Sequence, residues 1–128
     1  MQRTPINPVP WSIDLGFDQA ELVQGHRRLL LCSAQDAMDA HGASQHAGDM
    51  AAQLELSLDN LGAVLAAADM TLANVVRLNM YTTDIDELFK NNAVITERFG
   101  ESRYATSVLG VARLPGQFLV MLEATAVD

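Results

Sequence analysis

The sequence predicts an α/β (α+β) protein in which a mixed β-sheet carries two helices on one face. Two apolar runs rich in Val, Leu, Thr and Phe flank a Pro-Gly turn near the end of the chain. Residues 50–68 and 85–99 each repeat apolar side chains three and four positions apart, which is typical of helices that bury one face. The predicted order is β-β-α-β-α-β-β, and two helices cover only one face of such a sheet.

Residues 104–127 contain the strongest strand signal. The two apolar runs lie on either side of Arg113-Leu114-Pro115-Gly116. Proline presets φ for the first turn position and glycine accepts a positive φ after it, so this segment predicts a β-hairpin. Alternate positions of the second run are mostly apolar on both faces, so we expect both faces of the hairpin to be covered.

The first part of the chain is predicted to contain two short strands and a loop. Residues 1–16 hold three of the four prolines and are expected to form an extended or turning lead-in. Residues 17–23 and 29–35 have strand character, with a turn near Gly25 between them. Residues 36–48 are small and polar, which is typical of a loop.

The helices have recognisable ends. Asp49 is a plausible N-cap for the leucine-rich helix, which ends before a strand at 75–82 without a glycine. Asp84 begins a second helix in the same way, and Gly100 supplies its stop signal. Asn92 is the one polar member of the second helix's inward stripe. It is either a tolerated boundary asparagine or a side chain that holds a loop or a ligand.

Composition limits the class of protein. Residues 1–128 fit one globular domain with one core. The net charge of −8 and the lack of a basic cluster argue against nucleic acid as a partner. The single cysteine, Cys32, forms no disulfide within the chain, and it is either a buried inert thiol or a reactive nucleophile. The sequence has no signal-peptide pattern and no membrane-spanning run, so we expect a cytoplasmic protein with no membrane partner.

The sheet face without helices predicts an assembly. Arg77, Asn79 and Tyr81 alternate with the inward residues of their strand and therefore lie on that face, beside apolar side chains of the last strands. An apolar patch of this kind on a small protein usually marks an interface. We therefore expect a symmetric homo-oligomer with clefts between its subunits.

Several short motifs, in their order and spacing, resemble the RidA (YjgF-type) family of reactive-intermediate deaminases. The strongest are Val-Ala-Arg-Leu-Pro at 111–115 and Leu-Glu-Ala-Thr-Ala at 122–126. Supporting motifs are Phe-Asp-Gln-Ala at 17–20, Ser-Ala-Gln at 33–35 and Tyr-Thr-Thr-Asp at 81–84. The resemblance implies a chorismate-mutase-like fold, a homotrimer, and small-molecule pockets between subunits. It also implies hydrolysis of 2-imino or enamine acids to 2-keto acids without a metal or an organic cofactor.

The same resemblance locates a candidate site and its departures from the family pattern. Thr106 stands where the family carries the arginine that clamps the substrate carboxylate, and Met121 stands where it carries a glutamate. The glutamate two residues further on is kept as Glu123, whereas the pocket tyrosine is replaced by Phe17. The substrate-binding candidates are Phe17, Ser33, Asn92, Thr106, Ser107 and Met121, and the catalytic candidates are Thr106, Ser107 and Glu123.

These replacements change the expected ligand. Arginine binds a carboxylate through two parallel charge-assisted hydrogen bonds, whereas threonine offers one neutral hydroxyl. The candidate set therefore suits a less charged or more apolar ligand, unless a realigned Arg103 or Arg113 supplies the anchor.

Three functions follow from these observations: an imine or enamine deaminase with an altered substrate range, a non-catalytic or regulatory trimer that binds a small molecule, or an endoribonuclease or translation inhibitor. The acidic charge opposes the third. His41 and His46, with Asp39 and Asp49, match no familiar metal-binding spacing, and no Gly-x-Ser-x-Gly nucleophile motif is present. We therefore expect neither a metal nor another cofactor.

Overall fold

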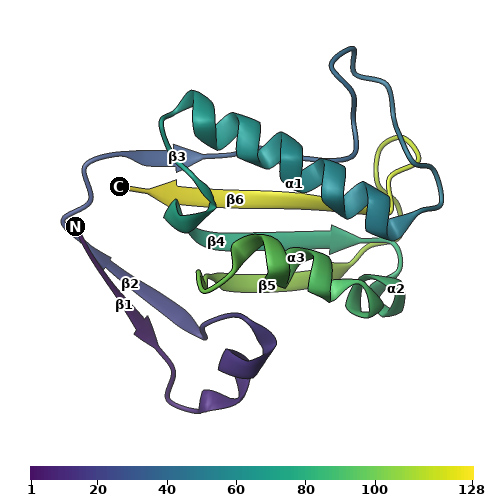
Figure 1. Cartoon of the computed structure of the whole chain (residues 1–128). Coiled ribbons are helices and arrows are strands. Elements are labelled where there is room, and N and C mark those ends of the chain that lie inside the picture. Colours follow the sequence, from purple (N-terminus) through teal and green to yellow (C-terminus); the bar gives the residue numbers. More distant parts are fainter.

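The main sheet is built around strand β4 (Val75–Thr82), whose bounds agree with the sequence prediction. In the computed structural model, which describes residues 1–128, this sheet has the order β3-β6-β4-β5 (Figure 1). Strand β6 (Val120–Val127) runs antiparallel to both β4 and β3 (Leu29–Leu31). Strand β5 (Ala105–Gly110) runs parallel to β4 on its other side.

The predicted hairpin between β5 and β6 is wrong. The Pro-Gly turn reverses the chain, and Gly116 has the positive φ of 65° expected there, but the two strands lie on opposite sides of β4. The connection between them passes over the end of β4. It is held there by hydrogen bonds from Val111 N to Thr82 O (2.8 Å) and from Thr83 N to Leu119 O (3.1 Å). Strand β4 thus pairs with β5 along one edge and with β6 along the other.

Three α-helices cover one face of the main sheet (Figure 1). Helix α1 (Met50–Ala67) begins at Asp49, whose side chain accepts a hydrogen bond from Ala52 N, so the predicted cap is confirmed. The second predicted helix is divided into α2 (Ile85–Lys90) and α3 (Asn92–Phe99). The break lies at Asn91, whose side-chain amide donates to the Glu87 carbonyl oxygen at 2.9 Å and so competes with helical bonding.

The core lies between these helices and the sheet. Leu54, Leu58 and Leu65 of α1 are fully buried against Leu78 of β4 and Leu122 of β6. The 3-10 helix η2 (Leu72–Asn74) leads from α1 into β4. None of the helices combines the length and the apolar character needed to cross a membrane.

The N-terminal segment forms a separate small sheet, which the sequence did not predict. Strand β1 (Gln2–Ile6) pairs antiparallel with β2 (Ala20–Gln24), and the 3-10 helix η1 (Pro10–Leu15) lies in their connection. The predicted strands at 17–23 and 29–35 both exist in part, as β2 and β3, but they are shorter and belong to different sheets. Figure 1 shows the small sheet inclined away from the main one.

Asp18 helps to join the small sheet to the rest of the molecule, and Glu21 of β2 interacts with it. Asp18 is 2% exposed, and its backbone N–H donates to the Tyr104 carbonyl oxygen at 3.0 Å. Its carboxylate accepts from Asn7 (2.7 Å) and from Arg103 (3.2 Å). Burial, together with a hydrogen bond to Asp18, raises the pKa of Glu21 to about 7, although the Arg3 guanidinium opposes the shift. Glu21 is thus protonated in the folded protein at pH values where the unfolded chain is ionised.

We expect Glu21→Gln to stabilise the protein at alkaline pH. A carboxyl group whose pKa is raised in the folded state makes its full contribution to stability when the pH is below its unfolded pKa, near 4.5. This contribution is lost as the pH rises through the folded pKa of about 7. The difference in free energy of unfolding between the variant and the wild type should therefore increase, in favour of the variant, by about 1–3 kcal/mol from pH 5 to pH 8. Urea titrations at both pH values measure this difference. Glu97→Gln, at an exposed position of α3, is the matched control, and an equal pH dependence in the wild type and Glu21→Gln would contradict the assignment.

Candidate active site

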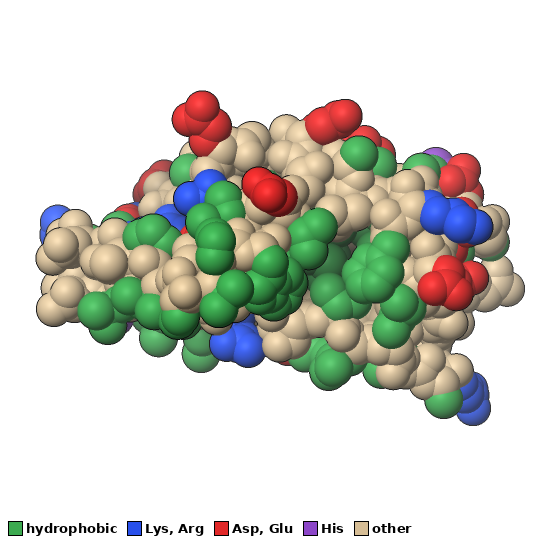
Figure 2. Space-filling model, turned by 90° about the horizontal axis from the view of Figure 1, so that it is seen from below, with side chains coloured by type: hydrophobic (Ala, Val, Ile, Leu, Met, Phe, Trp, Pro, Cys, Tyr) green, Lys and Arg blue, Asp and Glu red, His purple; other side chains and the backbone are tan.

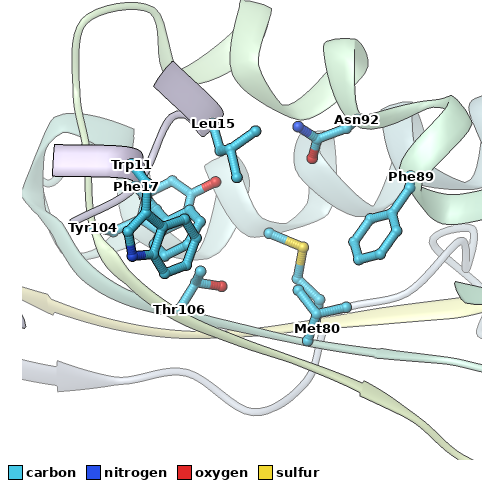
Figure 3. Close-up of a pocket in the computed structure, with 9 residues that line it drawn as sticks. Trp11, Leu15, Phe17, Met80, Phe89, Asn92, Tyr104 and Thr106 are labelled. Carbon is cyan, nitrogen blue, oxygen red and sulfur yellow. The ribbon is translucent and has the colours of Figure 1, made fainter. Parts of the chain in front are cut away.

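A cavity of about 430 Å³ lies on the helix-covered side of the main sheet, along its β5 edge. Figure 2 views the molecule from below relative to Figure 1, onto the β5 edge, and hydrophobic side chains gather there around a hollow. Trp11 of η1 and Phe89 of α2 are 55% and 58% exposed, which places large apolar groups at the opening. The cavity is lined by Trp11, Leu15, Phe17, Met80, Phe89, Asn92, Tyr104, Thr106 and Val108 (Figure 3).

One wall of the cavity comes from the N-terminal segment. Pro10 begins η1, and Gly16 ends it with a φ of 90°, a conformation that favours glycine. A Cβ on Gly16 would lie 3.0 Å from the Thr96 methyl group, so the absent side chain lets η1 approach α3 closely. Trp11 and Phe17 meet edge to face with ring centroids 5.6 Å apart. The segment thereby presents two packed aromatic rings to the cavity.

Thr106 lies on the floor of the cavity, on strand β5. Its hydroxyl donates a hydrogen bond to the Leu78 carbonyl oxygen of the neighbouring strand at 2.5 Å. A hydroxyl has one proton, so the proton of Thr106 is already used by the backbone. Toward the cavity this side chain offers oxygen lone pairs and a methyl group, which accept hydrogen bonds but do not donate them.

Two other polar groups face the same space. The Tyr104 hydroxyl points into the cavity, and the Asn92 amide projects toward it from the first turn of α3 (Figure 3). Tyr104 is 3% exposed, and burial raises the pKa of its hydroxyl, which therefore stays protonated as a donor. Its ring packs against Phe99 at a centroid distance of 4.6 Å. None of the nine lining residues carries a charge.

The structure brings together only part of the predicted site. Phe17, Asn92 and Thr106 meet in the cavity. Ser107 follows Thr106 in the strand and therefore faces the opposite side of the sheet. Ser107, Asn79 and Glu123 lie opposite one another across β5, β4 and β6, and Met121 lies two residues before Glu123 on the same face.

Ser33 also lies away from the cavity. It is exposed and follows β3, where its neighbours Cys32 and Gln35 hydrogen-bond to β6 through Ala124 and Leu122. Four of the seven predicted site residues are therefore separated from the cavity within one chain: Ser33, Ser107, Met121 and Glu123.

Glu123 is the centre of a polar cluster on the open face of the sheet. One of its carboxylate oxygens accepts hydrogen bonds from the Tyr81 hydroxyl (2.8 Å) and the Asn79 amide (3.1 Å). These bonds lower the pKa of Glu123, and the same contact raises the pKa of Tyr81. Glu123 is therefore an ionised carboxylate at neutral pH, held in one orientation by two donors.

The remaining candidates have other roles. Arg103 donates to Asp18, and neither it nor Arg113 lines the cavity. Cys32 is buried, and burial raises the pKa of its thiol, which favours the inert interpretation. No group of three His, Cys, Asp or Glu side chains is placed to hold a metal ion. Asp39 instead accepts hydrogen bonds from the backbone of His41 and Ala43 in its own loop.

Six of the nine lining residues were not predicted from the sequence as pocket residues: Trp11, Leu15, Met80, Phe89, Tyr104 and Val108. The signal for Trp11 was weak but present, since it is the only tryptophan of the chain and lies next to a proline at the start of a turn-rich segment.

Comparison with known proteins identifies relatives along the whole chain. The family model described as Endoribonuclease L-PSP matches residues 18–128. A RutC family protein of Pyrococcus horikoshii is 31% identical over 95% of this chain and 88% of its own length. The human 2-iminobutanoate/2-iminopropanoate deaminase is 29% identical over 88% of this chain and 80% of its own.

A solved structure agrees with this assignment and with the predicted fold class. The crystal structure of YyfB from Yersinia pestis, a protein of the conserved Rid family, superimposes with a TM-score of 0.88. It covers 100% of both chains at 34% identity. The motifs, the mixed sheet with helices on one face, and these relatives lead to one conclusion: the chain belongs to the RidA (YjgF-type) family.

Proposed function

We propose that the protein is a homotrimer whose subunits complete small-molecule pockets between them, and that it hydrolyses the C=N bond of a small imine or enamine with an altered substrate range. The division of the candidate site over two faces of the sheet carries this proposal. Thr106, Asn92 and Phe17 line the cavity on one face, while Glu123 lies on the other. One chain alone does not bring these groups together, but the open face of a second subunit against the cavity of the first would.

The proposed chemistry needs a bound water, a base and a proton donor. Water adds to the imine carbon as the base takes one of its protons and a proton passes to the nitrogen, which gives a tetrahedral carbinolamine. The hydroxyl proton is then transferred through the base to the nitrogen, so the C–N bond breaks and ammonia or an amine leaves as the carbonyl forms. Glu123, ionised and oriented by Tyr81 and Asn79, suits the base. Tyr104 and Asn92 offer hydrogen bonds to the nitrogen or the developing oxygen.

An imine-hydrolysis assay tests the catalytic part. Imines are made in situ by an amino acid oxidase or an amine oxidase, and the semicarbazide-trapped imine is followed in the presence and absence of the protein. We expect the wild type to accelerate the loss of at least one imine, and Glu123→Gln to lower that rate by about 100-fold or more. Glu97→Gln, an exposed glutamate of α3, is the matched control. Spontaneous rates with every imine would contradict catalysis.

The second candidate is a non-catalytic trimer that binds a small metabolite in a regulatory or buffering role. The observation that favours it is the composition of the cavity, where no ionisable group with a pKa near neutrality is present. Met121 also stands where the family carries a glutamate. Saturable ligand binding without imine turnover would support this alternative.

We expect no useful binding of RNA or DNA at physiological salt, although the matching family model carries an endoribonuclease description. The net charge of −8 repels phosphates, and the cavity offers no cation to them. A fluorescence-polarisation titration with single-stranded RNA and duplex DNA measures this directly. Submicromolar affinity with a steep salt dependence would contradict the expectation and favour the ribonuclease function.

A further inference from the structure

We propose that the cavity selects an electrically neutral ligand that has no carboxylate. This ligand has a flat apolar body and an N–H or O–H group that donates a hydrogen bond to the Thr106 oxygen. An uncharged imine, oxime or primary amide on an aromatic ring has this chemistry. The inference rests on the proposed function only in taking the cavity as the ligand site, and it holds whether or not the ligand is turned over.

The hydrogen bond of Thr106 sets the polarity of the cavity floor. Because the hydroxyl proton is donated to the Leu78 carbonyl oxygen, the oxygen of Thr106 presents only lone pairs to a ligand. A carboxylate has only lone pairs as well, so the two groups repel at this position. An N–H or O–H group of the ligand, by contrast, donates a hydrogen bond to the lone pairs of the Thr106 oxygen.

The other two polar groups call for an acceptor on the same ligand. The neutral Tyr104 hydroxyl is a donor, and the Asn92 amide offers both an N–H and a carbonyl oxygen. Neither side chain forms a hydrogen bond within the chain. A compact polar group that both donates and accepts hydrogen bonds matches this set, as in an oxime, an amide or an unsubstituted imine.

The surrounding charges exclude a stable anion. Arg103 already donates to Asp18 at 3.2 Å. Arg77, on the open face that the proposed assembly brings to the cavity, donates to Asn79 at 3.1 Å and lies on the same face as the Glu123 carboxylate. Moving an unpaired carboxylate from water into such a lining is strongly unfavourable. The chain's net charge of −8 adds a long-range repulsion of anions.

The walls define the shape of the ligand. Trp11 and Phe17 present packed rings on one side, and Phe89 lies at the opening. A volume of about 430 Å³ is at the lower end of the range for small-molecule sites, so a ligand of one or two rings fits it.

Trp11 gives a direct signal for occupancy, because it is the only tryptophan and lines the cavity. The test titrates the full-length protein with phenylacetamide and phenylacetate, which differ in charge but hardly in shape, and follows tryptophan fluorescence with calorimetry as a second measurement. We expect phenylacetamide to bind at least about tenfold more tightly than phenylacetate. Thr106→Val should lower the affinity for phenylacetamide about fivefold and leave the affinity for toluene unchanged. Thr83→Val, at an exposed site outside the cavity, should change neither affinity.

Two outcomes would overturn the inference. One is that phenylacetate binds as tightly as phenylacetamide, and the other is that neither probe binds at millimolar concentration. Failure here is distinct from failure of the proposed function. Imine turnover with preferred carboxylate binding would remove the neutral-ligand inference alone. A clear amide preference without turnover would remove catalysis and keep the ligand class.

Discussion

Thr106→Arg is expected to raise the affinity for 2-imino carboxylates and their 2-keto products by about one to two orders of magnitude. A guanidinium binds a carboxylate through charge-assisted hydrogen bonds worth about 1.5–3 kcal/mol each, against about 1 kcal/mol for a neutral one. Part of this gain is offset by moving arginine into an apolar cavity, which limits the net effect. The hydrolysis rate at saturation should stay close to the wild-type rate, because Glu123 remains the only proposed base and Met121 still supplies neither a second acid nor a second base.

The affinity is measured by titrating pyruvate against Trp11 fluorescence, and the rate by trapping iminopropanoate with semicarbazide. Thr106→Gln is the control, since it adds length and polarity to the same site without a charge. If the wild type hydrolyses iminopropanoate as fast as a relative with arginine at this position, the interpretation of Thr106 is wrong. Arg103 or Arg113 would then have to act as the anchor.

Gln53→Leu is expected to lower the free energy of unfolding by about 2–4 kcal/mol, because it leaves buried backbone groups without partners. Gln53 is fully buried in α1. Its amide donates to the His46 carbonyl oxygen at 3.0 Å, and its carbonyl oxygen accepts from Leu119 N at 2.8 Å. This side chain therefore links the start of α1 to the loop before it and to the segment before β6. Leucine has nearly the same volume as glutamine but cannot form these hydrogen bonds.

Urea denaturation followed by circular dichroism measures the change. Gln24→Leu, the same substitution at an exposed position of β2, is the control and should cost less than about 0.5 kcal/mol. Equal losses in the two variants would mean that the hydrogen bonds of Gln53 contribute little.

Local signals in the sequence predicted where helices and strands begin and end better than they predicted which strands pair. The bounds of β4 and the caps Asp49 and Asp84 depend on side chains within a few residues, and the structure confirms them. The hairpin prediction failed because a Pro-Gly turn specifies a reversal of the chain but not which strand lies beside the next. That choice depends on β4, which is distant in sequence and hydrogen-bonds to a different strand along each of its edges.

The site shows the same limit. Family resemblance located Phe17, Asn92 and Thr106, which do meet. It grouped Thr106 with Ser107, although two consecutive strand residues face opposite sides of a sheet, and that separation follows from the period of a strand alone. The composition marked Trp11 as unusual, but local reasoning could not place it in the cavity, because η1 reaches the cavity through long-range contacts such as Asp18 N to Tyr104 O.

The mass of the protein in solution tests most directly whether the two halves of the site meet between subunits. Size-exclusion chromatography with light scattering at micromolar concentration should give three times the 13.9 kDa monomer, about 42 kDa. A stable species near 13.9 kDa would contradict the assembly and, with it, the joining of Glu123 of one subunit to the Thr106 cavity of another.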